Sequence, residues 1–205
     1  MLKKFVILSA LLLVAFHSHA ADILKESGLK GGLIVVLGTD DIDDISSIAS
    51  DTYVIQVLGK SEKDVLKARE QIKTKGVYGK VSVSECNSEK LPYVDNLVNL
   101  VVDQSGKWQV ASEEIMRVLA PGGVALIQGK KSVKPIPPEI DEWRHYLHDA
   151  DNNAVANDTV VAAPRHIQWR AGPDWIRHHH MLASMSAVVT AKGRIFSVID
   201  TATAG

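Results

Sequence analysis

The sequence predicts an α/β fold with a doubly wound, mostly parallel sheet, followed by a short all-β segment. Between residues 22 and 131, short β-branched runs alternate with helical stretches, which is the pattern of βαβ units. Three prolines then fall within the seven residues 132–138. Beyond them the composition changes, because three of the four Trp and six of the eight His lie there. We therefore expect two regions with different architectures.

The overall composition is that of a globular protein and excludes several classes. The 205 residues are 46% hydrophobic with a formal net charge of -1, which suits one core and a smaller second unit. The near-neutral charge argues against a nucleic-acid binder that works by bulk phosphate neutralisation, and against a disordered acidic protein. The single cysteine, Cys86, excludes an intrachain disulfide framework and a multi-cysteine zinc module.

Residues 1–20 have the features of a secretory signal. Lys3 and Lys4 precede the apolar run Phe5–Phe16, and Ser18 and Ala20 supply small residues at the two positions that a signal peptidase inspects. The apolar run is shorter than the roughly 20 residues that a membrane-spanning helix needs. We expect cleavage after Ala20, a secreted or periplasmic mature chain, and no transmembrane span in that chain.

Residues 21–131 are expected to form the α/β domain. Its clearest helix covers 61–75, because Ser61 suits an N-cap and apolar side chains recur behind it at helical spacing. Ser112 is expected to cap the last helix, and the run from Pro121 to Gly123 to end it. The predicted strands are 33–37, 53–58, 80–86, 97–102 and 124–127, and the predicted helices are 22–30, 42–49, 61–75 and 112–119.

The candidate site lies at the carboxyl ends of these strands. Ligands of open parallel sheets bind there, near the point where the strand order reverses. The residues concerned are the turn Gly38-Thr39-Asp40-Asp41 after the first strand and Gly59-Lys60 after the second. Asp103 follows the fourth strand, where it is placed either to face a ligand or to cap its own turn.

This region resembles the class I S-adenosylmethionine-dependent methyltransferases over residues 28–131. The resemblance is carried by the strand and glycine turn at 33–38, by Leu91-Pro92-Tyr93, and by Glu114–Gly123, a helix with an R-V-L-x-P-G-G ending. It implies a Rossmann fold without the final hairpin strands of a complete family member. It also implies S-adenosylmethionine as the cofactor, and the residues that would lie around it are Gly38, Thr39, Asp40, Gly59 and Asp103.

The cofactor positions are where the sequence departs from that family. Asp40, Asp41 and Ile42 stand where the family has further small residues that let backbone amides approach the cofactor. Gly59-Lys60 stands where that family has an acidic residue that accepts hydrogen bonds from the ribose, and the ammonium group of Lys60 accepts none. S-adenosylmethionine is also a cytosolic metabolite, scarce outside the cell. We therefore expect the domain to be non-catalytic.

Beyond the linker 132–138, residues 139–205 resemble the opening of a pyrroloquinoline-quinone-like β-propeller. The resemblance rests on Trp143, the Asp- and Asn-rich stretch after it, the motif I-Q-W ending at Trp169, and the G-R-I-F-S-V-I-D strand. Ser184–Val189 and Arg194–Ile199 are expected to pair as a hairpin. At most one blade fits here, so we expect an incomplete propeller in the N-terminal piece of a longer extracytoplasmic bacterial protein.

Two histidine clusters in this second region are candidate ligand groups. His178, His179 and His180 point in different directions on an extended chain, which favours a polar loop over a shared metal. His145 and His148 would share one face of a helix at a spacing usable for metal binding, but no third ligand is evident. We therefore expect no metal site, and packing roles for the Trp residues.

Three functions remain open on the sequence. The first is an extracytoplasmic protein whose degenerate domain is fused to a truncated propeller that binds a protein or small-molecule partner, and no nucleic acid. The second is an active S-adenosylmethionine-dependent methyltransferase. The third is the N-terminal fragment of a quinone-dependent dehydrogenase-like protein, which would need a full propeller to hold pyrroloquinoline quinone. Cofactor binding by the first domain alone distinguishes the second function from the other two.

Overall fold

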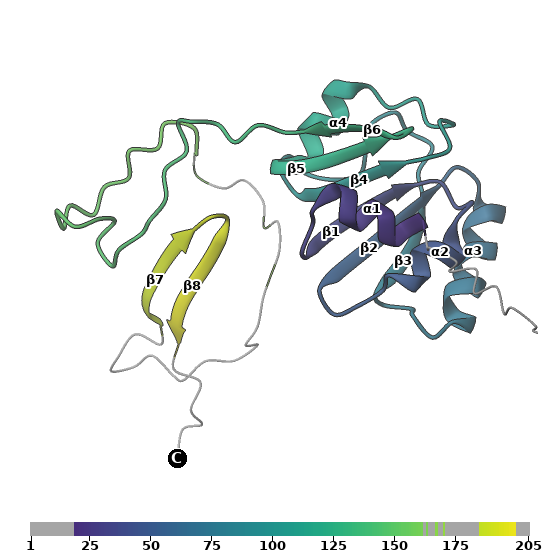
Figure 1. Ribbon diagram of the computed structural model, residues 1–205, viewed down its shortest axis with the longest axis horizontal. Coiled ribbons are helices and arrows are strands. Elements are labelled where there is room, and N and C mark those ends of the chain that lie inside the picture. Colours follow the sequence, from purple (N-terminus) through teal and green to yellow (C-terminus); the bar gives the residue numbers. More distant parts are fainter. Residues whose placement is uncertain (1–18, 162, 164–166, 168–169, 171–184, 200–205) are drawn as a thin grey trace, which may run out of the picture. The chain divides into compact units, whose positions relative to one another are not determined.

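The computed structural model describes residues 19–161, 163, 167, 170 and 185–199. The chain divides into two compact units, with the boundary between Val133 and Lys134 (Figure 1). Among the described residues, no helix combines the length and apolar character that crossing a membrane requires. The predicted cluster His178–His180 and most of the predicted I-Q-W strand lie outside the described residues.

Unit 1 is built on a six-stranded sheet in the order β3-β2-β1-β4-β5-β6. Neighbouring strands are parallel except β6, which runs antiparallel to β5. The strand order reverses between β1 and β4, as the predicted doubly wound sheet requires. The strands are β1 (Gly32–Leu37), β2 (Tyr53–Gly59), β3 (Val81–Glu85), β4 (Val98–Asp103), β5 (Leu119–Ile127) and β6 (Lys130–Val133).

Helices cover both faces of this sheet, as predicted. Three of them, α1 (His19–Ser27), α2 (Ile42–Ser47) and α3 (Glu62–Thr74), bury apolar side chains on one face, and α4 (Ser112–Val118) packs on the other (Figure 1). The central strands are apolar on both sides, so each face has its own hydrophobic core. Ser61 caps α3 by accepting a hydrogen bond from the Asp64 N–H at 3.2 Å, which confirms that prediction.

The stretch from Ser112 to Val133 differs from prediction in three places. Ala111, not Ser112, is the N-cap of α4, and no side chain caps this helix. The Pro121-Gly122-Gly123 run does not separate helix from strand, because β5 starts at Leu119 and passes through it. An added Cβ at Gly123 would lie 2.8 Å from the Ala120 carbonyl oxygen, so the irregular start of β5 requires glycine. Ser132 and Val133 belong to β6 and not to a linker.

Two of the three motifs that carry the methyltransferase resemblance form one hydrogen-bonded group. Arg117 on α4 donates to the Glu114 carboxylate and to the backbone carbonyls of Leu91 and Tyr93. Glu114 in turn accepts from the Leu91 N–H at 2.7 Å. The Arg117 guanidinium lowers the pKa of the Glu114 carboxyl, so the group is an ion pair at neutral pH. These motif residues hold a loop against the sheet.

Unit 2 contains a β-hairpin and an irregular segment hydrogen-bonded to it. The predicted hairpin is confirmed: β7 (Met185–Ala191) pairs antiparallel with β8 (Arg194–Ile199), and Lys192 and Gly193 make its turn with positive φ angles. The backbone of Trp143 lies along β7, since its N–H donates to Thr190 Oγ1 and its carbonyl accepts from the Thr190 N–H. The described residues supply two strands here, not the four of a propeller blade.

The stretch around His145 and His148 is not helical, so the shared helix face that would have suited metal binding does not form. These residues form a tight turn in which the backbone N–H of each donates to the carbonyl of the other. His148 has a φ of 72°, a left-handed conformation that no helix contains. The two side chains therefore do not have the helical spacing that metal binding would use.

Candidate functional site

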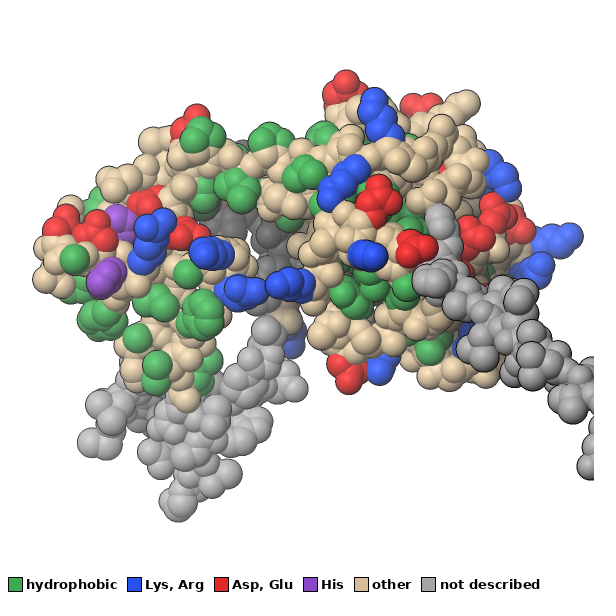
Figure 2. All heavy atoms as spheres, in the orientation of Figure 1, with side chains coloured by type: hydrophobic (Ala, Val, Ile, Leu, Met, Phe, Trp, Pro, Cys, Tyr) green, Lys and Arg blue, Asp and Glu red, His purple; other side chains and the backbone are tan. Residues whose placement is uncertain are grey.

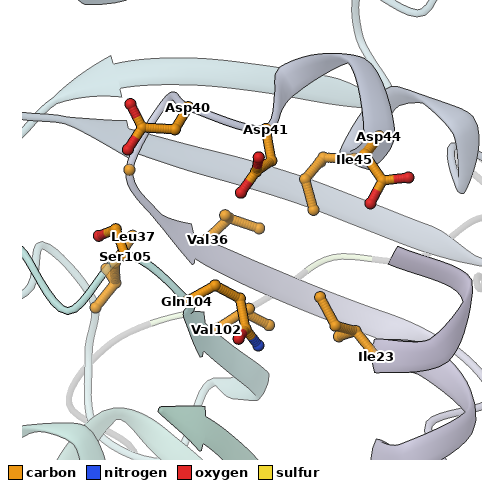
Figure 3. Close-up of a pocket in the computed structure, with 11 residues that line it drawn as sticks. Ile23, Val36, Leu37, Asp40, Asp41, Asp44, Ile45, Val102, Gln104 and Ser105 are labelled. Atoms are coloured by element: carbon orange, nitrogen blue, oxygen red, sulfur yellow. The ribbon is translucent and has the colours of Figure 1, made fainter. Parts of the chain in front are cut away.

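A small cavity lies at the carboxyl ends of β1 and β4, where the strand order reverses. It encloses about 20 Å³, which is room for about one water molecule. Figure 3 shows the carboxylates of Asp40, Asp41 and Asp44 on one side and Gln104 and Ser105, beyond the end of β4, on the other. Its remaining walls come from the end of β1, from α1 and α2, and from β4: Ile23, Val36, Leu37, Gly38, Ile45 and Val102.

The turn after β1 depends on a glycine with an unusual backbone angle. Gly38 has a φ of 116°, which side chains rarely allow, and its N–H donates to the Leu58 carbonyl of β2 at 2.9 Å. An added Cβ would lie 3.7 Å from Trp108 Nε1 and 3.8 Å from Ser105 Oγ. The loop after β4 therefore already lies over this glycine.

The acidic residues of the turn are bound to other parts of the protein. Asp40 accepts from the Lys107 ammonium at 2.8 Å, and this hydrogen bond raises the pKa of Lys107. Asp43 pairs with Lys75 at 3.2 Å. Asp44 accepts from the Ala20 N–H at 2.6 Å. Asp40 and Asp43 are thus each paired with a lysine of this chain.

The end of β2 is closely packed where the family resemblance implies a ribose-binding acid. Gly59 is buried, and an added Cβ would lie 2.8 Å from Val65 Cγ2 on α3 and 3.1 Å from Thr39 Cγ2. Thr39 and Gly59 therefore pack against each other and do not line the cavity.

Lys60 connects the end of β2 to the loop after β4. Its ammonium donates to the Lys107 carbonyl at 2.6 Å and lies 5.2 Å from the centre of the Trp108 ring, a cation–π distance. Together with the pair between Lys107 and Asp40, these contacts tie together the ends of β1, β2 and β4. We call Asp40, Lys60, Lys107 and Trp108 the strand-end bridge.

Asp103 at the end of β4 serves its own loop. It is 2% exposed and accepts from Ser105 Oγ at 2.9 Å and from the Gly106 N–H at 3.0 Å. These two hydrogen bonds to the Asp103 carboxylate hold the turn that carries Lys107 and Trp108. Of the two roles open for Asp103, the geometry favours the turn cap over a group facing a ligand.

The sequence-predicted site residues are therefore brought to one edge of the sheet but into different roles. Gly38 and Asp40 line the cavity, whereas Thr39, Gly59 and Asp103 support the loops around it. Sequence reasoning missed Lys107 and Trp108. Trp108 is the one Trp of the first region, and that isolation was the available signal.

One strand end departs from the cofactor contacts that the family resemblance implies. The position of the ribose acceptor holds Lys60, a donor already occupied by a carbonyl and an aromatic ring. The cavity holds about one water, so a nucleoside would require its walls, including Gln104 and Ser105 after β4, to move. Trp108, three residues beyond Ser105, is 9% exposed and packs in the core on one face of the sheet, so a larger displacement of this loop would expose buried apolar surface.

Unit 2 contains a second polar cluster, centred on His148. Its ring is buried against Trp143 in an edge-to-face contact, and Nε2 lies 2.6 Å from an oxygen of Asp141. Asp141 also accepts from the backbone N–H groups of Asn157 and Glu142, and these bonds with the His148 contact lower its pKa to about 2. Sequence reasoning missed Asp141. Within the described ranges, no three His, Cys, Asp or Glu side chains are arranged to hold a metal ion.

The strand order, the motif contacts and the comparisons with known proteins together define the class of unit 1. It has the Rossmann-like fold of the class I S-adenosylmethionine-dependent methyltransferases. No family model matches the chain.

The curated relatives are enzymes of quinone biosynthesis. The ubiquinone/menaquinone biosynthesis C-methyltransferase UbiE of Escherichia fergusonii is 27% identical over 143 residues, which are 64% of this chain and 57% of that protein. The same enzyme of Yersinia enterocolitica is 26% identical over 144 residues, 65% of this chain and 57% of the relative. This chain thus matches little more than half the length of these relatives.

Solved methyltransferase structures are also similar. A putative S-adenosyl-L-methionine-dependent methyltransferase from Methanococcus maripaludis is 20% identical with a TM-score of 0.47, covering 54% of this chain and 53% of its own. A SAM-dependent methyltransferase from Aquifex aeolicus is 22% identical with a TM-score of 0.46, covering 60% and 71% respectively.

Proposed function

We propose that this chain is an extracytoplasmic protein whose methyltransferase-like domain is non-catalytic, and whose second unit is part of a propeller-like module that binds a partner or acts as a scaffold. The strand-end bridge carries the first part of the proposal. It places protein side chains where the resemblance implies a cofactor. A domain whose strand ends are closed in this way keeps the methyltransferase fold but does not transfer methyl groups.

The bridge supports this proposal through both charge and packing. Lys60 offers an ammonium group where a ribose needs acceptors, and its partners are a carbonyl and the Trp108 ring. Asp40, which the resemblance implies beside the cofactor, is neutralised by Lys107. Binding a nucleoside there would break these contacts and expose Trp108, so the bound state is disfavoured.

The extracytoplasmic part of the proposal rests on residues 1–20. A basic start, a short apolar run and small residues before Ala21 are the ordered features of an exported chain. Such a chain meets little S-adenosylmethionine after export. Location and the altered strand ends therefore favour the same function by independent arguments.

The binding role of unit 2 is supported by the apolar surface of its hairpin. Hydrophobic side chains lie on this surface in Figure 2, and Ile195, Phe196 and Val198 of β8 are each more than half exposed. A two-stranded sheet is marginally stable by itself, so such a surface suits packing against further strands or a partner.

An active methyltransferase is the second candidate, and the similarity to C-methyltransferases favours it. Gly38 keeps the left-handed turn after β1 that backbone recognition of a cofactor needs. In this alternative the loop from Gln104 to Val110 moves away from the sheet when S-adenosylmethionine binds. The substrate would remain to be found among small molecules or proteins outside the cytoplasm.

Calorimetric titration separates the two candidates. S-adenosylmethionine and S-adenosylhomocysteine are titrated into the mature chain, residues 21–205, and into a variant carrying Lys60→Asp and Trp108→Ala. A matched control carries Lys63→Asp, which makes the same charge change at an exposed position of α3. We expect no binding heat from wild type or control at millimolar ligand. Micromolar binding by the wild-type chain would establish the active alternative.

A further inference from the structure

The hairpin of unit 2 has one edge in contact with another segment and one edge that is open in the described residues. Along β7, the Thr190 N–H donates to the Trp143 carbonyl at 2.7 Å, and the Trp143 N–H donates to Thr190 Oγ1 at 2.8 Å. In the described part of the chain, β7 is the single neighbouring strand of β8 (Figure 1). An unpaired edge presents a row of backbone N–H and C=O groups, which is a template for another strand.

β8 lacks the features that keep most edge strands apart. Natural edge strands are protected by charged side chains, by proline, by bulges or by being very short. The six residues Arg194–Ile199 contain no proline, and their one charge, on Arg194, lies at the turn end. The irregularity in the hairpin register lies in β7, between Met185 and Ala187. By contrast β6, the edge strand of unit 1, has two lysines among its four residues.

The side chains of β8 favour pairing on both of its faces. Successive side chains of a strand point to opposite faces, so Phe196 and Val198 share one face and Ile195 lies on the other. All three side chains are more than half exposed. β-branched and aromatic residues are the ones that fit a pleated sheet best. A strand that pairs along this edge therefore gains apolar neighbours on both faces.

We propose that β8 pairs with β8 of a second copy of this chain, in antiparallel orientation, to give a four-stranded sheet. The proposal rests on the partner-binding part of the proposed function and says which partner that is. A symmetric pair uses the same surface of both copies, so the strand must be its own complement. A two-fold axis through Ser197 meets this condition, because residues opposite each other then lie on the same face.

The register centred on Ser197 sets apolar side chains opposite each other. Ile195 of each copy lies opposite Ile199 of the other, and Phe196 lies opposite Val198. Such pairs of β-branched and aromatic residues stabilise antiparallel sheets. The two Ser197 hydroxyls lie opposite each other at the centre, and hydroxyl pairs hydrogen-bond across strands. The sequence of β8 is therefore complementary to itself in this register.

Charge favours the same arrangement. Lys192 in the turn and Arg194 near it are the cations of the described hairpin. An antiparallel pair puts the two turns at opposite ends of the sheet, so these like charges stay apart. Asp200 follows Ile199 in the sequence, so an acidic residue comes directly after each β8, at the end where the other copy has Arg194. A parallel pair would instead put arginine beside arginine, which is destabilising.

The contact between the two β8 strands, which we call the seam, is short, so the dimer is expected to be weak. Six residues at about 3.4 Å each give a paired length of about 20 Å. Permanent dimers bury about 2,000 Å² or more, which a seam of this length does not reach. We therefore expect monomer and dimer to exchange, with the dimer favoured as the concentration rises.

Sedimentation equilibrium of the mature chain, residues 21–205, over a range of concentrations tests the proposal. We expect a reversible monomer–dimer equilibrium in wild type. Val198→Lys adds a cation at the seam, diagonally across from the same group of the other copy and from its Arg194, and should weaken the dimer by about tenfold or more. The matched control Val188→Lys makes the same change on β7, away from the seam, and should leave dimerisation unchanged.

A mixture of variants guards this test against a folding defect. The two copies of position 198 are diagonal neighbours in this register, so Val198→Lys mixed with Val198→Glu should dimerise more strongly than either variant by itself. A chain that is monomeric at every concentration would overturn the proposal. So would a dimer that Val198→Lys leaves intact, a dimer that Val188→Lys weakens equally, or a mixture that does not recover. A monomeric chain would leave the result of the cofactor titration, and with it the non-catalytic assignment, unaffected.

Discussion

The buried scaffold of unit 1 and the loops at the carboxyl ends of its strands differ in how closely they follow the methyltransferase pattern. The scaffold keeps the parallel strand order, two apolar cores and the motif around Arg117. The strand ends replace the expected cofactor contacts with Lys60, Lys107 and Trp108. The most recognisable motif residues here are packing and hydrogen-bonding groups, so they identify a fold and not an activity.

The largest expected effect comes from the scaffold. Leu100 lies at the centre of β4 and is fully buried, so Leu100→Ala should lower the free energy of unfolding by about 2–5 kcal/mol through lost burial and a cavity. Ile195→Ala, at a position 55% exposed on β8, should change it by less than about 0.5 kcal/mol. Urea unfolding followed by circular dichroism measures both. Equal effects would contradict the assignment of stability to the unit 1 core.

Substitution of a glycine at the strand ends should have the next largest effect on stability. Gly59→Ala places a methyl group 2.8 Å from Val65 Cγ2, an overlap expected to cost about 1–3 kcal/mol. Val65→Ala removes that atom, so the double variant should be less destabilised than the sum of the two single variants. Chemical denaturation of the four chains gives the coupling. Simple additivity would show that the end of β2 is not packed as described.

The polar cluster of unit 2 predicts a pH dependence. The pKa of Asp141 is lowered to about 2 in the folded chain, so its carboxylate contributes stability above about pH 4 and loses it as the pH falls towards 2. Asp141→Asn should remove this acid transition while leaving the unit 1 sheet unchanged. The acid transition can be followed in the amide NMR signals of Asn157 and His148. The same acid transition in wild type and variant would assign it to another group.

The smallest expected effect comes from the ion pair of the strand-end bridge. The side chains of Lys107 and Asp40 are 69% and 55% exposed, so water and ions screen their pairing and it should contribute little to stability. Lys107→Ala should therefore lower stability slightly, and less so in high salt, because ions screen exposed charges. Thermal unfolding at two salt concentrations measures this. A larger, salt-independent loss would mean that the loop depends on Lys107 in another way.

The spacing of apolar residues along the sequence was sufficient to predict most of the helices and strands of the scaffold. Strands β1 to β4, helices α2 and α3 and the hairpin of unit 2 follow runs of apolar residues with clear turn or cap signals. Strand β6 was missed because Lys130-Lys131-Ser132-Val133 has no apolar alternation and is defined by its pairing with β5. The Pro121-Gly122-Gly123 run suggested a break, but its glycines allow a distorted strand start against Val98.

The candidate site was predictable in location but not in detail. The position of Gly38 and the loss of an acid at Lys60 follow from residue order alone. The contacts of Lys60 with Lys107 and Trp108 join residues nearly fifty positions apart through a loop without periodicity, so no local pattern indicates them. The same holds for Asp141 and His148, whose contact depends on a tight turn with a left-handed residue.

The proposed function depends on strand ends of unit 1 that are closed by the chain's own side chains. Backbone amide NMR of residues 21–205 during addition of S-adenosylhomocysteine tests it most directly, because it reports on each strand end separately. We expect no saturable shifts at Gly38, Gly59, Lys60 and Gly106 up to millimolar ligand. Saturable shifts confined to these amides would contradict it and identify a working cofactor site.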